Sequence, residues 1–416
     1  MRSAAVRAAT ALAWQAVDGR AVPRRSTALL AARACPVCDS TRARPVLTLR
    51  DFQFFTDSST TRKRVDVTQQ QCLDCFALHL NPAYSRRGFA VLFREAGRSY
   101  GATDARPTEQ AGWLAERGLL RAGSELLDLG CYDGSFLAAL PGDVRRVGVD
   151  ADAPALARGR RRWPGITFVE GDPERFAYAG TPDVVTMFHV LEHLPRPVAV
   201  LRRLRRLARP GARLVVEVPI LERGHTNDVN GFFSVQHMTH FSRATLRACL
   251  ARGGWAVVEW SEMPGYNGCR VLAAPTTEAS AVRGDADDVA ALHACLASWH
   301  GAVAAVERRL SAVGDAPRIV VWGAGLHTEL VHQLTALFHA SPERRWALVD
   351  GDPMKQGRSW RGLRIHPPEA LAGSDVGEAP LVISSYGSQE EIAAGAMRLG
   401  VAPGRLVRLY ADVAVY

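Results

Sequence analysis

Lysine is almost absent from this chain of 416 residues: it occurs only at positions 63 and 355, so 49 of the 51 basic residues are arginine. The formal net charge of +9 raises the question of a nucleic-acid partner, but the basic residues form no single long block. In the densest run, LRRLRRLAR at 201–209, the apolar residues fall at helical spacing, so the arginines most simply form the solvated face of a helix. The sequence therefore argues against a nucleic-acid partner.

Long apolar runs are also lacking. No stretch approaches the roughly 20 apolar residues that a membrane-spanning helix requires, so we expect no membrane span. The first 30 residues are rich in arginine and alanine and poor in acids, as targeting peptides are. Their apolar part is short, is interrupted by Gln15 and Asp18, and is followed by no convincing cleavage site. We interpret residues 1–30 as a loose or helical extension.

Cysteine is sparse except in two tight pairs, CPVC and CLDC, which hold four of the eight cysteines. Two such C-x-x-C knuckles complete the tetrahedral shell of one Zn²⁺ ion. A disulfide framework would not pair its cysteines so closely and leave the rest of a long chain almost bare, and redox-active dithiols are the remaining alternative. We predict a structural zinc, with a hairpin-bearing insert between the knuckles, held by Cys35, Cys38, Cys72 and Cys75. Thiolate-bound zinc implies a reducing compartment, so we expect a cytoplasmic protein.

The rest of the chain alternates short apolar runs with helical patterns, which is typical of a parallel sheet built from βαβ units. A chain of this length with 47% apolar residues is expected to form two or three domains. The runs GGWAVVEWSE and CRVLAAP predict two closing strands at an antiparallel edge. We divide the chain into an extension (1–30), a zinc-binding module (31–85), a helical linker (86–120), a main α/β domain (121–275), a helical connector (276–316) and a smaller α/β domain (317–416).

The main domain begins with the run ELLDLGCYDGSFLAAL. This run predicts a strand that ends at an acidic residue, a turn through Gly130 and Gly134, and then a helix. Such a turn alone serves NAD, FAD and S-adenosylmethionine (SAM) equally. The order of the acids favours SAM. Asp128 precedes the glycines, where it suits a cationic sulfonium and its amino-acid tail. Asp150 ends the second strand, where it can accept hydrogen bonds from ribose, and Asp172 follows the third strand on the adenine side.

These residues make positions 125–275 resemble the class I SAM-dependent methyltransferases. LLDLGCYDGSFL matches the first motif of that family, and the run from 183 to 219 matches its fourth strand, its histidine-bearing turn, the next helix and the fifth strand. Tyr132 stands where the family has its middle glycine, which makes the cofactor turn bulkier. We expect Phe188 and His189 to line the adenosine pocket.

The order of the domains resembles the sugar C-methyltransferases of deoxysugar pathways, which place a zinc module first, a SAM domain second and a small α/β domain last. The resemblance implies two important histidines, which fall on His193 in HVLEHL and on His237 in FFSVQHMTHFS. The second motif of that family is Tyr-His-Glu-His. This chain has Ser234, Val235 and Gln236 before His237, so it keeps only the last histidine.

Methyl transfer from a sulfonium is an in-line displacement that asks the protein mainly for alignment. An acceptor hydroxyl, or a carbon beside a carbonyl, must also lose a proton to a base within hydrogen-bond reach. Histidine suits this task because its ordinary pKa lies near neutrality. We predict His237 as the base, with His193 at the carboxyl edge of the sheet as the second candidate and His240 as the third. Capping or packing in loops is the alternative for all three.

The smaller domain repeats the strand–turn–helix plan in VVWGAGLHTELVHQL, with Asp350 at the end of its next strand. Thr328 follows where the third glycine of a dinucleotide fingerprint is missing, which argues against a full dinucleotide. In the sugar C-methyltransferases that the chain resembles, a similar domain helps to hold the nucleotide-linked substrate. We predict that Gly323, Gly325 and Thr328 offer amides and a hydroxyl to phosphate. Retention of the domain for packing or dimerisation is the alternative.

The sequence therefore predicts a SAM-dependent methyltransferase with structural zinc that acts on a small molecule, with C-methylation of a nucleotide-linked keto-sugar as the leading hypothesis. An O- or N-methyltransferase acting on a non-sugar natural product is one alternative. An RNA methyltransferase is another, although the chain has neither a basic block nor the N/D-P-P-[YF] motif of amino-methylating nucleic-acid enzymes. A nucleotide-binding protein without catalysis is the third.

Overall fold

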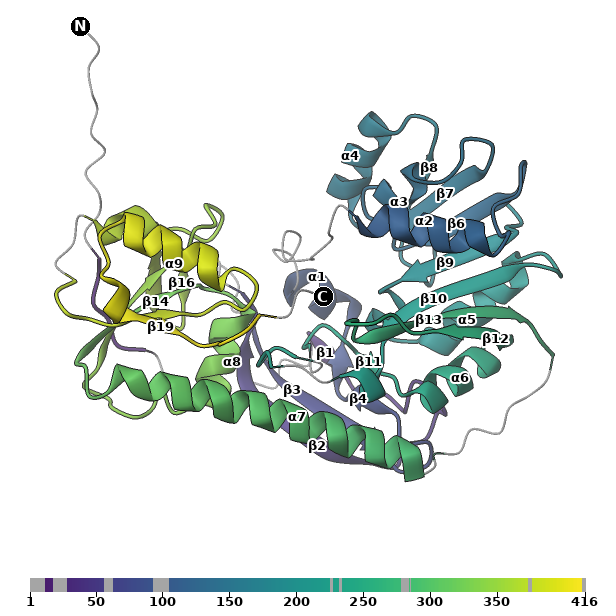
Figure 1. Ribbon diagram of the computed structural model, residues 1–416. Coiled ribbons are helices and arrows are strands. Elements are labelled where there is room, and N and C mark those ends of the chain that lie inside the picture. Colours follow the sequence, from purple (N-terminus) through teal and green to yellow (C-terminus); the bar gives the residue numbers. More distant parts are fainter. Residues whose placement is uncertain are drawn as a thin grey trace, which may run out of the picture.

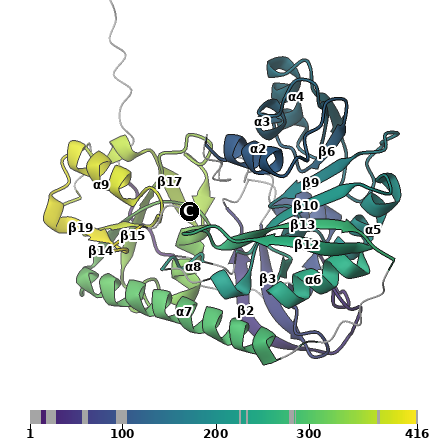
Figure 2. The ribbon, with the colours of Figure 1, turned by 45° about the vertical axis from the view of Figure 1, so that its right-hand side comes forward.

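The computed structural model describes residues 12–17, 28–55, 63–92, 105–224, 227–231, 234–277, 284, 286–372 and 376–413. In this part of the chain two α/β lobes lie on opposite sides, and a strand-rich module lies below and between them (Figure 1). A long helix runs along the lower edge, as the turned view also shows (Figure 2). Along the chain the cysteine-bearing module comes first, the main α/β lobe second and the smaller α/β lobe last.

The main domain is built on a seven-stranded sheet with the order β12-β13-β10-β9-β6-β7-β8. The five strands from β10 to β8 in this order run parallel, whereas β13 is antiparallel to β10 and β12 is antiparallel to β13. The predicted antiparallel edge is therefore confirmed. The strands are β6 (Glu125–Leu129), β7 (Arg145–Asp150), β8 (Thr167–Glu170), β9 (Val184–Phe188), β10 (Arg213–Pro219), β12 (Trp255–Ser261) and β13 (Gly268–Pro275).

Helices cover the main sheet. Its central strands are rich in leucine and valine, as is typical of strands buried on both faces. In the arginine-rich helix, Leu201 and Leu204 are fully buried while Arg202 is exposed, which confirms the predicted solvated face. Arg106 opens a helix that precedes the first strand and packs against α3, so part of the predicted linker covers this sheet. The helices are α2 (Arg106–Glu116), α3 (Ser135–Ala138), α4 (Ala153–Arg162), α5 (Pro197–Leu207) and α6 (Arg243–Arg252).

The cysteine-bearing module has a four-stranded antiparallel sheet with the order β11-β4-β3-β2. Its strands are β2 (Ala43–Gln53), β3 (Arg64–Cys72), β4 (Leu78–Leu80) and β11 (Thr239–His240), and beside them β1 (Leu30–Ala31) pairs with β5 (Ala83–Tyr84) ahead of helix α1 (Arg86–Leu92). The β2–β3 hairpin confirms the predicted insert, and its tip lies outside the described residues. β11 follows β10 along the chain, so this sheet fastens the segment around residue 240 to the module.

The smaller domain has a six-stranded sheet with the order β16-β17-β15-β14-β18-β19, parallel except where β16 meets β17. Its strands are β14 (Arg318–Trp322), β15 (Arg345–Val349), β16 (Ser359–Trp360), β17 (Leu363–His366), β18 (Leu381–Ile383) and β19 (Leu406–Arg408), and its helices are α8 (Leu326–Leu334) and α9 (Gln389–Arg398). In the N-terminal extension, the described residues 12–17 are neither loose nor helical, because Gln15 bridges to Trp346 of β15. Most of the extension lies outside the described residues.

Helix α7 (Ala286–Leu310) is the predicted connector. The segment Asp287–Val313 is long and apolar enough to cross a membrane, with a mean hydropathy of 1.5, so the expectation that no stretch would qualify missed one candidate. By length and composition alone, the core helix of a soluble protein passes the same test. The helix buries one residue every three or four positions against the rest of the chain, namely Leu292, Cys295, Trp299, Ala302, Val306 and Leu310. That stripe is typical of a helix packed along one face.

Candidate functional site

The turn after β6 brings the end of one strand against the end of its neighbour. Gly134 has φ +81°, and a Cβ atom built on it would lie 2.5 Å from Cζ of Phe168, so only glycine fits there. The backbone N–H of Tyr132 donates to Oδ2 of Asp150 across 2.8 Å. The predicted residues Gly130, Gly134 and Asp150 are therefore brought together where β6 and β7 end.

Tyr132 adopts the left-handed conformation that glycine usually supplies, with φ +50°. Its side chain is 37% exposed, and its hydroxyl accepts a hydrogen bond of 3.0 Å from Nη2 of Arg158. The Arg158 guanidinium also lies 5.4 Å from the centre of the tyrosine ring. The side chain that distinguishes this turn from the common glycine therefore points outward, and the turn keeps its backbone path without a third glycine.

The three predicted acids close three neighbouring strands, β6, β7 and β8, along one edge of the sheet. Asp128 is only 3% exposed, and its Oδ1 accepts a hydrogen bond of 2.7 Å from the Thr186 hydroxyl. Burial, reinforced by the charge of Asp150, raises the pKa of Asp128 to about 7. A cation placed beside this carboxyl would favour its ionised form. Asp150 and Asp172 are half-buried.

Phe188 and His189, the predicted adenosine contacts, follow one another at the end of β9. Phe188 packs edge-on against Phe136, with ring centres 4.8 Å apart. His189 is held by buried polar groups: its Nδ1 lies 3.1 Å from Oε1 of Glu192, and its Nε2 meets the Tyr266 hydroxyl. Burial lowers the pKa of His189, but its bonds to Glu192 and Glu217 outweigh burial and the net pKa is raised.

Glu217 is the centre of a buried ionic network that the sequence analysis missed. Its carboxylate, at the end of β10, is fully buried and pairs with Arg106 and, across 2.6 Å, with Arg270. Burial would raise the pKa of Glu217, but the hydrogen bond from His189 and the charge of Arg270 outweigh it, so the pKa lies well below its usual range. Arg270 also bonds to Glu109, 161 positions away. Only the fold brings such distant residues together.

The three histidines predicted to act on the acceptor lie side by side. The ring centres of His193 and His237 are 4.9 Å apart, and those of His237 and His240 are 5.6 Å apart. His193 sits on the short 3₁₀ turn Leu191–His193, and His240 on β11 contacts the Gln69 amide of the module across 2.9 Å. Burial, together with its histidine neighbours, lowers the pKa of His237 well below its ordinary value. His237 is therefore a neutral imidazole at neutral pH, as a base must be.

The glycine turn of the smaller domain is formed as predicted, but two of its residues have other roles. A Cβ atom on Gly323 would lie 2.4 Å from the carbonyl oxygen of Ser384, the residue after β18, and the Gly323 N–H donates to the Val349 carbonyl across 2.8 Å. Thr328 is fully buried, and its hydroxyl donates to the Gly323 carbonyl across 2.6 Å. The Gly323 amide and the Thr328 hydroxyl are already used within the protein, which corrects the expectation that these two residues offer them to phosphate.

A cleft of about 1040 Å³ joins the glycine turn of the smaller domain to the segment that carries His237. One side is formed by residues of the smaller domain, including Gly323, Gly325 and Lys355. The other includes Asp228, Asn230, Ser234 and Gln236. Nζ of Lys355 lies 3.0 Å from Oδ2 of Asp350. Lys355 is one of the two lysines of the chain and was not predicted as a site residue. The sequence feature that could have indicated a role is its position, five residues after Asp350 at the end of a strand.

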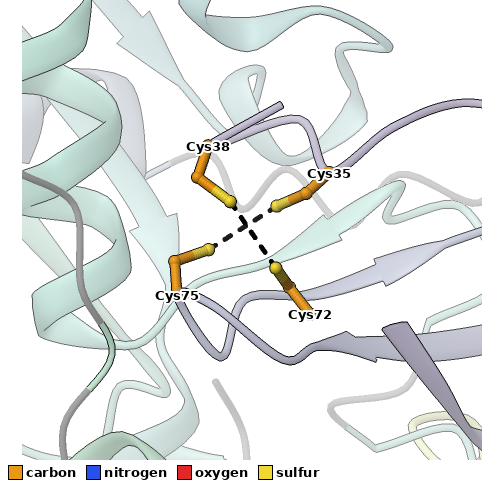
Figure 3. Close-up of side chains that lie close together, drawn as sticks. All are labelled: Cys35, Cys38, Cys72 and Cys75. Carbon is orange, nitrogen blue, oxygen red and sulfur yellow. Dashed lines mark hydrogen bonds between the residues drawn. The ribbon is translucent and has the colours of Figure 1, made fainter. Parts of the chain in front are cut away.

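The four cysteines of the two knuckles converge on one point (Figure 3). The sulfurs of Cys35 and Cys75 are 3.6 Å apart, and those of Cys38 and Cys72 are 3.5 Å apart. No disulfide joins them, and a tetrahedral Zn²⁺ with Zn–S bonds of about 2.3 Å places its sulfurs roughly 3.8 Å apart. The donor set and its spacing therefore fit zinc. Arg252 of α6 pairs with Asp39 beside the first knuckle, across 2.6 Å.

The main domain is an open α/β sheet, and its candidate site lies at the carboxyl ends of the strands, where sheets of this class bind their ligands. Residues 104–260 match the family model described as "Methyltransferase domain". The chain therefore carries a class I SAM-dependent methyltransferase domain, which includes the acids of β6 to β8 and all three histidines. Neither the four cysteines nor the smaller domain falls within the matched residues.

Curated relatives align with parts of this domain. Trans-aconitate 2-methyltransferase of Methylobacterium nodulans is 34% identical over 115 residues, which are 27% of this chain and 45% of that protein. Demethylmenaquinone methyltransferase of Beutenbergia cavernae is 40% identical over 98 residues, 23% of this chain and 41% of that protein. The chain thus spans less than half the length of these two relatives. A solved SAM-dependent methyltransferase of Clostridium acetobutylicum superposes with a TM-score of 0.36 at 9% identity, covering 46% of this chain and 98% of that one.

Proposed function

We propose that this protein transfers a methyl group from SAM to a carbon atom of a nucleotide-linked keto-sugar. The observation that carries the proposal is the cleft, which runs from the glycine turn of the smaller domain to the segment that precedes His237. An acceptor with a nucleotide at one end and a reactive sugar at the other would span those two regions. A small acceptor without a nucleotide would leave the smaller domain without a role in binding.

The methyltransferase domain is proposed to hold the cofactor along the edge where β6, β7 and β8 end. SAM supplies the methyl group and departs as the thioether. Asp150 retains acceptor sites for ribose hydroxyls, since a carboxylate can accept about four hydrogen bonds and two come from backbone amides here. Asp128 faces the cationic end, Asp172 faces adenine, and Phe188 adds apolar surface.

The acceptor is proposed to place its phosphates at Gly325, beside the ammonium of Lys355. The backbone amides at the start of α8 favour negative charge. The sugar then lies toward Gln236, and the neutral imidazole of His237 accepts the proton from the carbon beside the sugar carbonyl. Loss of that proton generates the nucleophilic carbon, which takes the methyl group from the sulfonium.

The four-cysteine cluster is proposed to hold a structural Zn²⁺. Four thiolates close the coordination shell, so no position is left for a substrate or an activated water. The ion would fix both knuckles against α6 through the Arg252–Asp39 pair. It would also stabilise the module sheet whose strand β11 carries His240, so its effect on catalysis is positional.

An O-methyltransferase that acts on a non-sugar molecule is the second candidate. It is favoured by the similarity to the ubiquinone biosynthesis O-methyltransferase of Pseudomonas aeruginosa, which is 36% identical over 109 residues. The same base would serve, because a hydroxyl acceptor must also lose a proton. An acceptor of this kind carries no nucleotide, so the cleft beside Lys355 would have no ligand under this second candidate.

The proposal is tested by incubating the protein with SAM labelled in its methyl group and with four acceptor classes: nucleotide-linked keto-sugars, the same sugars without the nucleotide, phenols and RNA. We expect label only in a nucleotide-linked sugar, with a new carbon–carbon bond visible by NMR. Label confined to phenols would support the second candidate. SAM binding without transfer to any class would contradict the proposed function and favour a non-catalytic nucleotide-binding protein.

Lys355→Ala is expected to raise KM for the nucleotide-linked acceptor by about 10- to 100-fold with little change in kcat, because a hydrogen bond to a charged group contributes roughly 1.5–3 kcal/mol. Lys355→Arg should retain most of the affinity. The matched control is Arg364→Ala, which removes an exposed charge on β17 outside the cleft lining. An unchanged KM in Lys355→Ala would show that this end of the cleft does not bind phosphate.

A further inference from the structure

A second group of metal-ligating side chains lies apart from the four cysteines. Ligand atoms of Glu192, His193 and His237 all lie within 4.8 Å of one another. Glu192 and His193 share one 3₁₀ turn, and His237 comes from the segment that passes over it. The backbone N–H of Met238 donates to the Glu192 carbonyl across 2.8 Å, which clamps the two segments together.

His193 has the protonation pattern of a metal-binding histidine. Its Nδ1 lies 3.1 Å from the carbonyl oxygen of Gln236. A carbonyl can only accept, so the proton is on Nδ1 and the lone pair is on Nε2. Metal-ligating histidines typically donate their other ring N–H in this way, which fixes the tautomer and the ring orientation. The free Nε2 lies 3.9 Å from Oε1 of Glu192.

Glu192 provides an independent observation that points to a ligand. Its side chain is 1% exposed, and Oε1 lies 3.1 Å from Nδ1 of His189. Its other oxygen, Oε2, is buried and receives no hydrogen bond from the described residues. A buried carboxylate oxygen without a donor is costly. A cation beside it would remove that cost.

His237 completes the group. The part of the chain that the structure describes places no hydrogen-bond donor or acceptor on its imidazole, which packs against the rings of His193 and His240. The side chain is half-buried. One imidazole nitrogen is therefore available to a ligand on the same side as Nε2 of His193.

We propose that Glu192, His193 and His237 form a binding site for a divalent cation of the zinc, cobalt or nickel type. Two imidazoles and one carboxylate suit these ions, whereas four thiolates form a separate and softer site. Bound ligand atoms would be roughly 3.0–3.5 Å apart, given bonds of about 2.1 Å, so the side chains close around the ion by small rotations. Three protein ligands leave open positions for water.

One consequence rests on the proposed function. The cation takes the lone pair that His237 would use as a base, so an occupied site should inhibit methyl transfer. Binding itself does not depend on any activity. The site can therefore be tested, and can fail, whether or not the protein methylates a sugar.

The test uses the full chain after brief treatment with a mild chelator that leaves the four-cysteine site loaded. Co²⁺ is added and followed by calorimetry and visible absorption. We expect one additional Co²⁺ per chain, with weak bands of nitrogen and oxygen ligation and no thiolate charge-transfer band. Glu192→Gln and His193→Gln should each weaken this binding at least 10-fold, in line with the losses of roughly 10- to 100-fold seen when even outer partners of a metal site are removed.

The matched control is Glu222→Gln. Glu222 also has a buried carboxylate oxygen without a hydrogen bond among the described residues, but it belongs to no such histidine group. In the wild-type chain, bound Co²⁺ should also shift the ring N–H proton signals of two histidines, a readout that needs no variant to fold. No additional Co²⁺, or binding that both variants leave unchanged, would overturn the site. If the site fails while methyl transfer persists, the proposed function stands.

Discussion

Cys72→Ser is expected to abolish zinc binding and to destabilise the module severely. The structural ion in zinc-finger peptides contributes about 10–16 kcal/mol, whereas a whole domain has a net stability of roughly 5–15 kcal/mol. Cys72 ends β3, and its sulfur lies 3.5 Å from that of Cys38, so one substitution opens the shell of both knuckles. We expect the zinc content to fall from one ion per chain to none, and the melting temperature to fall by more than about 10 °C.

The matched control for this variant is Cys295→Ser on α7. Cys295 is equally buried, but its sulfur donates to the Gly224 carbonyl across 3.8 Å and belongs to no metal-ligating group among the described residues. The Cys295→Ser protein should keep its zinc, and its free energy of unfolding should fall by about 1–2 kcal/mol, the usual range for a core substitution. Elemental analysis and thermal melting measure both quantities. A Cys72→Ser protein that melts like the control would show that the cluster is not a structural metal site.

His237→Ala is expected to lower kcat for the nucleotide-linked sugar by about 10²- to 10⁴-fold, the range that a positioned base contributes. The affinity for S-adenosylhomocysteine should not change, because the cofactor edge lies at β6 to β8. The control is His300→Ala, an exposed histidine of α7 that should leave kcat as it is. Steady-state kinetics and calorimetry separate the two effects. A kcat within twofold of the wild type would assign the base to another group.

The pH dependence of the reaction gives a second readout of His237. A base acts in its deprotonated form, and activity is lost as pH falls through its pKa. Burial holds the pKa of His237 well below its ordinary value of 6.5. In a plot of kcat against pH, the midpoint of the fall that His237 causes on the acid side should therefore lie below pH 6.5. The value of kcat should stay level between pH 6.5 and 8. A midpoint near 7 would assign that limb to another group, such as Asp128, whose pKa is raised to about 7.

Local signals were sufficient for much of the fold. The alternation of apolar runs and helices predicted the parallel strands of both α/β domains, and the spacing of the cysteines predicted a cluster that the structure brings together. Three histidines that are far apart or loosely spaced in the chain were predicted to share a role, and they are neighbours. Each of these predictions depends on short-range periodicity or on residue types that have few uses.

What the sequence could not predict depends on contacts between distant positions. Glu217 is stabilised by Arg106 and Arg270, and nothing near Glu217 in the chain indicates either partner. Strand β11 lies in the sheet of the module although its neighbours in the chain belong to the main domain. Thr328 sits at a position typical of a ligand contact, but its hydroxyl bonds to the carbonyl of its own turn. Periodicity contains no information about such pairings.

The central claim is that three acids at the ends of β6, β7 and β8 bind the adenosyl cofactor. Calorimetry with S-adenosylhomocysteine tests this most directly, using the wild type, Asp150→Ala and the exposed-loop control Asp143→Ala. The account predicts one site per chain in the wild type and the control. In Asp150→Ala it predicts an affinity lower by about 10- to 100-fold, since hydrogen bonds to a charged group contribute roughly 1.5–3 kcal/mol. No heat with S-adenosylhomocysteine, together with tight binding of NAD that Asp150→Ala weakens, would contradict it.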